Sequence, residues 1–162
     1  MITIEKKSLK VGKYVNTEHV DTVVRNYKQE RWVYNSERIG KEDSLSGWYS
    51  IEEMEEFIER AKQSGGDGIR IYFGAYPTDY AEKPEYAGRQ TLVFVATKNK
   101  ETEAGPANKD IYIQTEEGSN ILAYNAVYLC PPICNPREIS PSARKGLGIT
   151  IVDQGEKGMS VI

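Results

Sequence analysis

Two cysteines, Cys130 and Cys134, are the side chains whose type and spacing best suit chemistry. They lie four residues apart and enclose Pro131, Pro132 and Ile133. Thiols at this spacing can form a disulfide, supply half of a metal site, or pack as small apolar groups. Because Pro131 and Pro132 restrict the backbone, they are expected to fix a turn that can contain a cis prolyl bond.

Each chemical role of the cysteine pair meets an obstacle in the sequence. A structural zinc site needs four ligands, and the chain offers two thiols and one histidine, His19. A thioredoxin-like site has two residues between its cysteines, whereas here there are three. A disulfide over this short spacing is possible, but a reducing cytoplasm disfavours its persistence. We therefore expect two inert free thiols, with a metal or redox role for Cys130 and Cys134, including a zinc ion shared across a dimer, as the alternative.

A second set of side chains, Arg70, Tyr72, Tyr76 and Arg89, forms a candidate ligand-binding surface. Arg70 and Tyr72 alternate along a predicted strand, so they share its outer face, and Tyr76 and Arg89 border the loop that follows. Guanidinium groups beside phenols suit anionic or planar ligands, through paired hydrogen bonds and stacking. The alternative is an ordinary outer sheet face covered by a helix, with the arginine stems lying along it.

No other group of residues predicts catalysis. One histidine restricts triads to His19, and the glutamates between residues 52 and 59 are explained by the solvated face of a helix. The glycines at 65, 66 and 68 precede a strand, whereas a phosphate-binding loop precedes a helix. We predict no catalytic residues and no cofactor, and an enzyme that uses carboxylate, tyrosine and arginine chemistry remains an alternative.

The composition limits the partners. The 162 residues include 21 basic and 24 acidic side chains, and a net charge of -3 leaves no basic surplus for a nucleic-acid backbone. No apolar run reaches the length of about 20 residues that spans a bilayer, and the first ten residues lack the apolar core of a signal peptide. These features predict a cytoplasmic protein that binds neither nucleic acid nor membrane.

Two amphipathic helices are predicted in the N-terminal half. Apolar residues recur at helical spacing from Thr17 to Glu30, and Asn16 or Thr17 can cap this helix. The second helix, about Ile51 to Ser64, begins with a capping box formed by Ser50 and Glu53. Its apolar face holds five residues, Ile51, Met54, Phe57, Ile58 and Ala61. Gly65 stands where a helix often ends in a left-handed conformation.

Most strands are predicted after these helices, which favours an α+β fold with both helices packed on a mainly antiparallel sheet. Residues 69–73 alternate, so Ile69, Ile71 and Phe73 should face the core, and the apolar run 91–96 is the predicted central strand. Further strands are predicted at 110–113, 149–152 and 159–162, and residues 121–129 as a strand or a short helix.

The chain is predicted to form one domain, residues 1–136, followed by an appendage or hairpin over residues 137–162. The boundary follows from four prolines between Pro131 and Pro141. The C-terminal strands can pair with each other or with another chain, which predicts a homodimer through this segment.

Three segments together resemble a group of small uncharacterised bacterial proteins. They are Gly68–Pro77 (GIRIYFGAYP), Thr91–Thr97 (TLVFVAT) and Cys130–Cys134 (CPPIC). The resemblance implies a discrete bacterial domain and carries no active-site motif. We predict a non-enzymatic binding or interaction domain whose partner is a small molecule or a protein.

Overall fold

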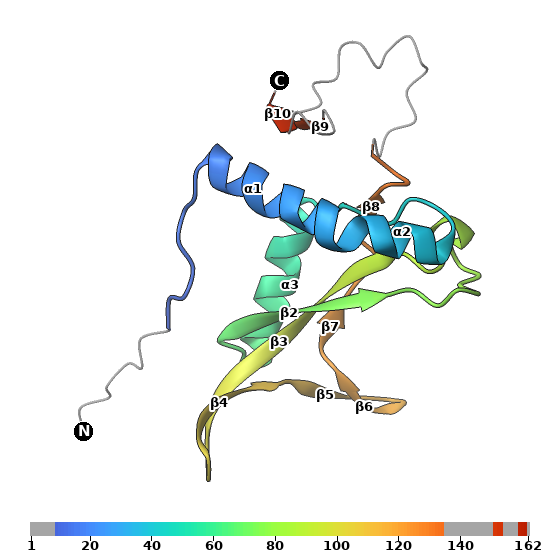
Figure 1. Cartoon of the computed structure of the whole chain (residues 1–162). Coiled ribbons are helices and arrows are strands. Elements are labelled where there is room, and N and C mark those ends of the chain that lie inside the picture. The colour runs from blue at the N-terminus through green and yellow to red at the C-terminus, as the bar shows by residue number, and fades with distance from the viewer. Residues whose placement is uncertain (1–8, 135–150, 154–158, 162) are drawn as a thin grey trace, which may run out of the picture. The chain divides into compact units, whose positions relative to one another are not determined.

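The computed structural model describes residues 9–134, 151–153 and 159–161 and has an α+β fold with mainly antiparallel strands (Figure 1). The chain divides into two compact units. Among the described residues, the first unit holds Gly47–Tyr128 and those up to Gly12, and the second holds Lys13–Ser46 and those from Leu129 onward. Within the described residues, none of the helices is both long and apolar enough to cross a membrane.

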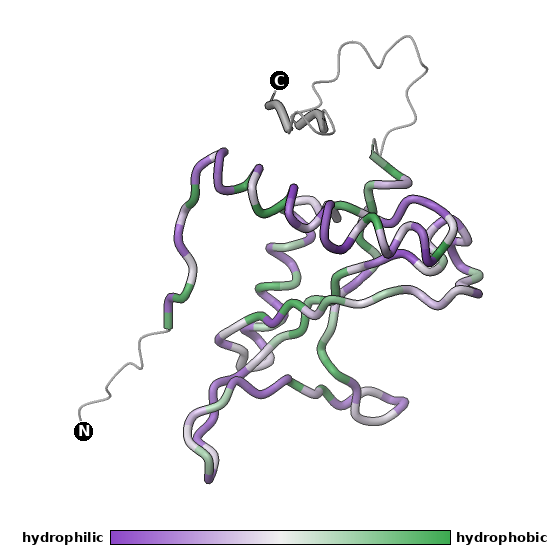
Figure 2. The backbone as a smooth tube through the Cα atoms, in the orientation of Figure 1, coloured by the Kyte–Doolittle hydropathy of each residue, from purple (hydrophilic) through white to green (hydrophobic). Residues whose placement is uncertain are grey.

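The main sheet of the first unit is built around β3 (Gln90–Thr102), which confirms the predicted central strand. Its neighbours are β2 (Gly68–Ala75), β4 (Gly105–Asp110) and the short β7 (Ala123–Tyr124), all antiparallel to it. Because β4 and β7 both lie on the side of β3 away from β2, strand β2 forms an edge of the sheet. In Figure 2 the far end of the β3–β4 hairpin is largely hydrophilic.

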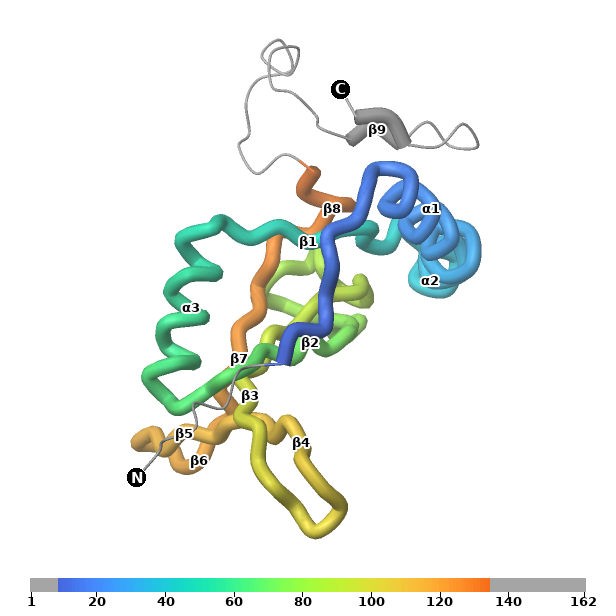
Figure 3. The backbone as a smooth tube through the Cα atoms, turned by 90° about the vertical axis from the view of Figure 1, so that its left-hand side faces the viewer, coloured from blue at the N-terminus to red at the C-terminus, as the bar shows by residue number. Residues whose placement is uncertain are grey.

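Helix α3 (Ile51–Gln63) packs on one face of this sheet, beside β3 and β7 (Figure 3). The predicted capping box is present: the Glu53 N–H donates to Ser50 Oγ (3.1 Å), and the Ser50 N–H donates to the Glu53 carboxylate (3.0 Å). Gly65 has the predicted positive φ, 83°. The core between helix and sheet consists of Phe57, Ala61, Ala96 and Leu122.

On α3 and β2, fewer apolar residues are buried than the sequence predicted. Ile51 and Ile58 are 76% and 39% exposed, because only one narrow side of α3 reaches the sheet. On β2, Ile69, Ile71 and Phe73 are 41%, 48% and 82% exposed rather than buried. They share one sheet face with the β3 residues that contact α3, but β2 is the edge strand and the core under α3 does not extend to it.

Shorter strands complete the first unit. The predicted strand at 110–113 is divided at Ile111, between the end of β4 and β5 (Tyr112–Thr115), which pairs with β6 (Gly118–Ile121). The segment 121–129 contains short strand pieces instead of one element. The last piece, β8 (Tyr128–Cys130), pairs with β1 (Ser46–Trp48), and both strands include residues of each unit. A 3-10 turn, η2 (Pro84–Tyr86), lies in the loop before β3.

In the second unit, one continuous helical segment runs from Thr17 to Ile39, nine residues beyond the predicted end at Glu30. It comprises α1 (Thr17–Tyr27), the π-helical turn η1 (Lys28–Trp32) and α2 (Val33–Ile39). Asn16 caps its start by accepting a hydrogen bond from the His19 N–H (3.0 Å). Gly40, with φ 71°, ends it. The predicted helix is too short because Trp32–Tyr34 were interpreted as residues that could either extend the helix or begin a turn.

The predicted C-terminal strands are present as β9 (Ile151–Asp153) and β10 (Met159–Val161), which pair antiparallel with Val152 opposite Ser160. The predicted domain boundary between residues 136 and 137 lies outside the described residues.

Candidate functional site

Arg70 and Tyr72 belong to one hydrogen-bond network with Asn108 and Asp110, which we call the Arg70 network. The Arg70 guanidinium donates to a carboxylate oxygen of Asp110, to the Asn108 carbonyl (2.7 Å) and to the Tyr72 hydroxyl (3.2 Å). The Tyr72 hydroxyl donates to the other Asp110 oxygen (2.7 Å). The predicted sharing of one strand face by Arg70 and Tyr72 is therefore confirmed.

The Arg70 network links three strands. Arg70 and Tyr72 lie on β2, whereas Asp110 ends β4, on the other side of β3. Thr97 of β3 pairs with Gly68 on one side and with Asp110 on the other, which brings Asp110 within reach of Arg70. The hydrogen bond to Tyr72 and the charge of Asp110 raise the pKa of Arg70, so the guanidinium stays charged.

These contacts determine what the surface can bind. The Arg70 side chain is 38% exposed and Tyr72 is 42% exposed, so both can still meet a partner. The Asp110 carboxylate offsets the charge of Arg70, which weakens any attraction for an anionic small molecule. The hydrogen bonds also hold the side chains in one arrangement, which lowers the entropy cost of binding. The network therefore suits a protein surface better than a free anion.

Tyr76 and Arg89 lie at the two ends of the loop before β3, in a different set of contacts. The Tyr76 N–H donates to the Arg89 carbonyl (3.0 Å) and closes the loop. The Tyr76 hydroxyl donates to Asn125 (2.8 Å), and its ring stacks on Tyr80 with centroids 4.5 Å apart. Arg89 is only 7% exposed, and its Nε donates to the Glu85 carbonyl (2.7 Å). The structure thus brings the four predicted residues together as two pairs.

A carboxylate beside a tyrosine also occurs at the start of α3. Glu53, already held by Ser50, accepts a hydrogen bond from the Tyr124 hydroxyl (2.8 Å). The Ser50 N–H, the Tyr124 hydroxyl and the Ser50 hydroxyl lower the pKa of Glu53. The same bond to Glu53 is the main cause that raises the pKa of Tyr124. A carboxyl group held in its charged form serves as a cap and anchor, whereas a general acid needs a raised pKa.

The lowered pKa of Glu53 predicts a pH dependence of stability. A carboxyl whose pKa is lower in the folded state stabilises the fold above its unfolded pKa, about 4.3, and this contribution disappears as pH falls through the folded pKa. Glu53→Gln should therefore lower the free energy of unfolding by about 1 kcal/mol at neutral pH, and the difference from wild type should shrink below about pH 4. Urea unfolding at a series of pH values measures it.

Glu55→Gln is the matched control, because it removes a charge from an exposed position of the same helix. It should leave the pH profile close to that of wild type. A Glu53→Gln difference that stays constant down to about pH 2 would contradict a lowered pKa at Glu53.

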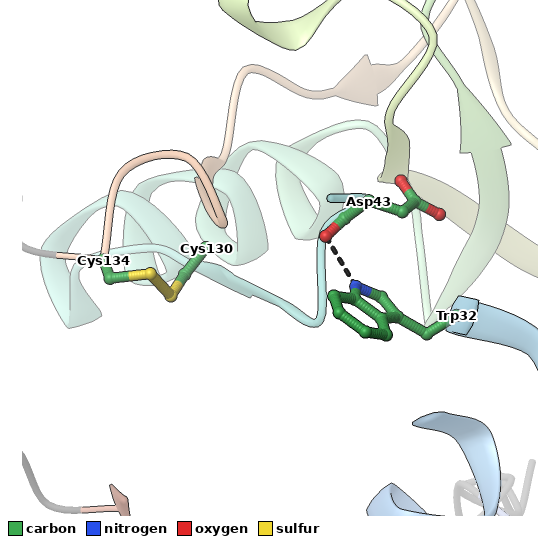
Figure 4. The surroundings of a disulfide bond; sticks show 4 residues. All are labelled: Trp32, Asp43, Cys130 and Cys134. Atoms are coloured by element: carbon green, nitrogen blue, oxygen red, sulfur yellow. Dashed lines mark hydrogen bonds between the residues drawn. A yellow bond between two sulfur atoms is a disulfide. The ribbon is translucent and has the colours of Figure 1, made fainter. Parts of the chain in front are cut away.

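The cysteine pair corrects an expectation. Cys130 and Cys134 form a disulfide, with their Cα atoms 4.5 Å apart, where two free thiols were predicted (Figure 4). The turn between them brings the sulfur atoms together, since the Ile133 N–H donates to the Leu129 carbonyl (2.7 Å). Both prolyl bonds in this turn are cis. The prediction gave the inferred compartment more weight than this local proximity.

The disulfide loop joins a small set of contacts within the second unit. The Cys130 carbonyl accepts a hydrogen bond from the Leu45 N–H (2.8 Å). Near Leu45, the Trp32 indole donates to the Asp43 carbonyl (2.7 Å), as Figure 4 shows. Among the described residues, no group of three or more His, Cys, Asp or Glu side chains could hold a metal ion. A metal role for the cysteines would first require reduction of the disulfide, and it stays a prediction.

Sequence reasoning did not identify Asp110, Tyr124 or Asn125 as partners of the predicted residues. Asp110 was recognised only as the start of a strand, and its reach to Arg70 depends on the register of three strands. Tyr124 and Asn125 lie in a segment whose conformation was left open.

Comparisons of the chain with protein-family models, with curated proteins and with solved structures gave no match. The resemblance to small bacterial proteins stays a prediction.

Proposed function

We propose that this chain is a protein-interaction domain that binds its partner through strand β2. The observation that carries the proposal is the exposure of β2 on both faces. Ile69, Ile71 and Phe73 present apolar side chains on one face, and Arg70 and Tyr72 present polar and aromatic groups on the other. Exposed apolar groups beside arginine and tyrosine are typical of the centres of protein interfaces.

Site-specific photocrosslinking tests this proposal in cells that produce the full chain. A benzophenone amino acid in place of Phe73, which is 82% exposed, should give a crosslinked protein product. The matched control is the same amino acid in place of Tyr112, an aromatic residue that is 63% exposed on β5. Products no stronger at position 73 than at position 112 would exclude β2 as the contact surface. Arg70→Ala should weaken the product at position 73 if the Arg70 network contributes.

Two alternatives have support from single observations. The disulfide and the exposed Cys134 favour thiol–disulfide exchange, in which a partner thiolate attacks one sulfur and the other cysteine leaves as a thiolate. Two free thiols in a titration of unreduced native protein would argue against this function. The second alternative is an enzyme of unfamiliar type that uses carboxylate and tyrosine chemistry. The hydrogen bonds of Tyr124 with Glu53 and of Tyr72 with Asp110 bring such groups together. Loss of a detected activity in Glu53→Gln, with folding intact, would support that alternative.

Three further features belong to the same proposal and stay predictions. They are a cytoplasmic location in a bacterium, a role for the C-terminal strands in pairing two chains, and packing of the first helix, Thr17–Glu30, on the sheet.

A further inference from the structure

Strand β2 offers a row of backbone hydrogen-bonding groups in addition to its side chains. Ala75 lies opposite Gln90, and next to this pair the Tyr76 N–H donates to the Arg89 carbonyl. Ala96, which lies opposite Ile69, has its backbone hydrogen bonds with Leu122 and Ile111, on the side of β3 away from β2. Residues of an antiparallel strand alternate between bonding their neighbour and pointing away from it. The N–H and C=O groups of Ile69, Ile71 and Phe73 therefore point to the outer edge of the sheet, where β2 has no strand partner among residues 9–134.

This edge lacks the features that usually prevent strands from pairing. Natural edge strands are short, or carry lysine, proline or a bulge. β2 has eight residues without lysine or proline, and its one charged side chain, Arg70, is held by Asp110 of the same chain. A long apolar edge of this kind is a template for another strand.

The sequence of β2 is complementary to itself in one antiparallel register. With Ile71 opposite Ile71 of a second copy, Ile69 lies opposite Phe73, and Arg70 lies opposite Tyr72. All three apolar residues then share one face, and each arginine meets a phenol instead of a like charge, as Arg70 and Tyr72 already do within the chain. The outward backbone groups of Ile69, Ile71 and Phe73 also face each other, as hydrogen bonding requires.

We propose that the partner of β2 is a second copy of this chain, and that the two β2 strands pair antiparallel about Ile71 to join two sheets into one. This inference rests on the proposed interaction function and names its partner. The two-fold axis passes between the two Ile71 residues, so the interface is closed and no further edge is offered at β2.

A charge exchange at Ile71 tests the register. Ile71→Lys places two lysines opposite each other, and Ile71→Glu places two glutamates there, so each variant alone should raise the dissociation constant of the dimer by about tenfold or more. A mixture of the two variants should restore a dimer that contains one chain of each. Sedimentation of the full chain and of the mixture measures these states, and circular dichroism verifies folding.

Ile121→Lys and Ile121→Glu are the matched controls, because Ile121 is a strand residue that is 37% exposed on β6. Both should remain dimers. If the Ile71 variants fail to fold, Phe73→Lys changes a side chain that is 82% exposed and should weaken the dimer as well.

Three outcomes would overturn the inference. The first is a dimer that neither Ile71 variant weakens, and the second is a wild-type chain that sediments as a monomer. The third is a monomer that dimerises only after residues 1–8 are removed, which would assign the edge to the chain's own N-terminus.

If crosslinking at position 73 captures a different protein while the chain is a monomer, the proposed function stands and the homodimer is wrong. If position 73 gives no specific product, both fail.

Discussion

Replacing Phe57 by alanine is expected to lower the free energy of unfolding by about 3–5 kcal/mol. Phe57 is 5% exposed, and its ring contacts Phe94 and Tyr124, with centroids 6.5 and 5.9 Å away. Truncation removes the apolar transfer energy and these aromatic contacts, and it leaves a cavity between α3 and the sheet. The shift in the urea midpoint at constant slope measures the loss.

Ile58→Ala is the matched control for Phe57→Ala, since Ile58 is the next residue of α3 and is 39% exposed. Alanine also has the higher helix propensity, so the loss should stay within about 1 kcal/mol. Equal losses for the two substitutions would mean that α3 does not pack on the sheet through Phe57.

Replacing Tyr86 by alanine is expected to lower the free energy of unfolding by a similar amount, about 3–5 kcal/mol. Tyr86 is completely buried although it lies in the loop before β3. Its ring lies 5.7 Å from Tyr76, and the Lys83 ammonium stands 5.0 Å above it. Tyr86 therefore anchors the loop that positions Tyr76 and Arg89, and its loss should disorder that loop.

Tyr80→Ala is the matched control for Tyr86→Ala, because it removes a stacked tyrosine of the same loop that is not fully buried. Tyr80 lies in the same loop, is partly exposed and stacks on Tyr76, so its loss should be about 1 kcal/mol. Amide hydrogen exchange at Tyr76 and Arg89 should rise in Tyr86→Ala and stay near wild type in Tyr80→Ala. Unchanged protection in Tyr86→Ala would contradict the anchoring role.

The best-predicted element is α3, because its signals are local. Ser50, Glu53 and Gly65 act within one or two turns of the helix, so the sequence is sufficient to place the start and end of α3. The central position of β3 was also predictable, since an uninterrupted apolar run is typical of a strand with neighbours on both sides.

The exposure of β2 could not be predicted from its alternating pattern. Alternation shows that Ile69, Ile71 and Phe73 share a face, but a face is buried only if another element covers it. The position of β2 at the sheet edge, and the narrow contact of α3 with β3, decide that outcome. Both are properties of the tertiary arrangement.

The sequence identified residues of the candidate site but not which of them contact each other. Arg70 and Tyr72 were correctly placed together because they are two residues apart on one strand. Asp110 joins them only because the β2–β3 and β3–β4 registers meet at Thr97. Arg89 was predicted on a surface, whereas it is only 7% exposed and its Nε donates to the Glu85 carbonyl.

The disulfide gives this protein a practical property for spectroscopy. Both cysteines of the chain are consumed by one bond within a single short loop. Under non-reducing conditions, a cysteine introduced elsewhere is thus the sole reactive thiol, and a spin label or fluorophore attaches at one known position without prior removal of native cysteines. A label at Ala75, an exposed residue at the end of β2, would report the distance between the two sheets of the proposed dimer.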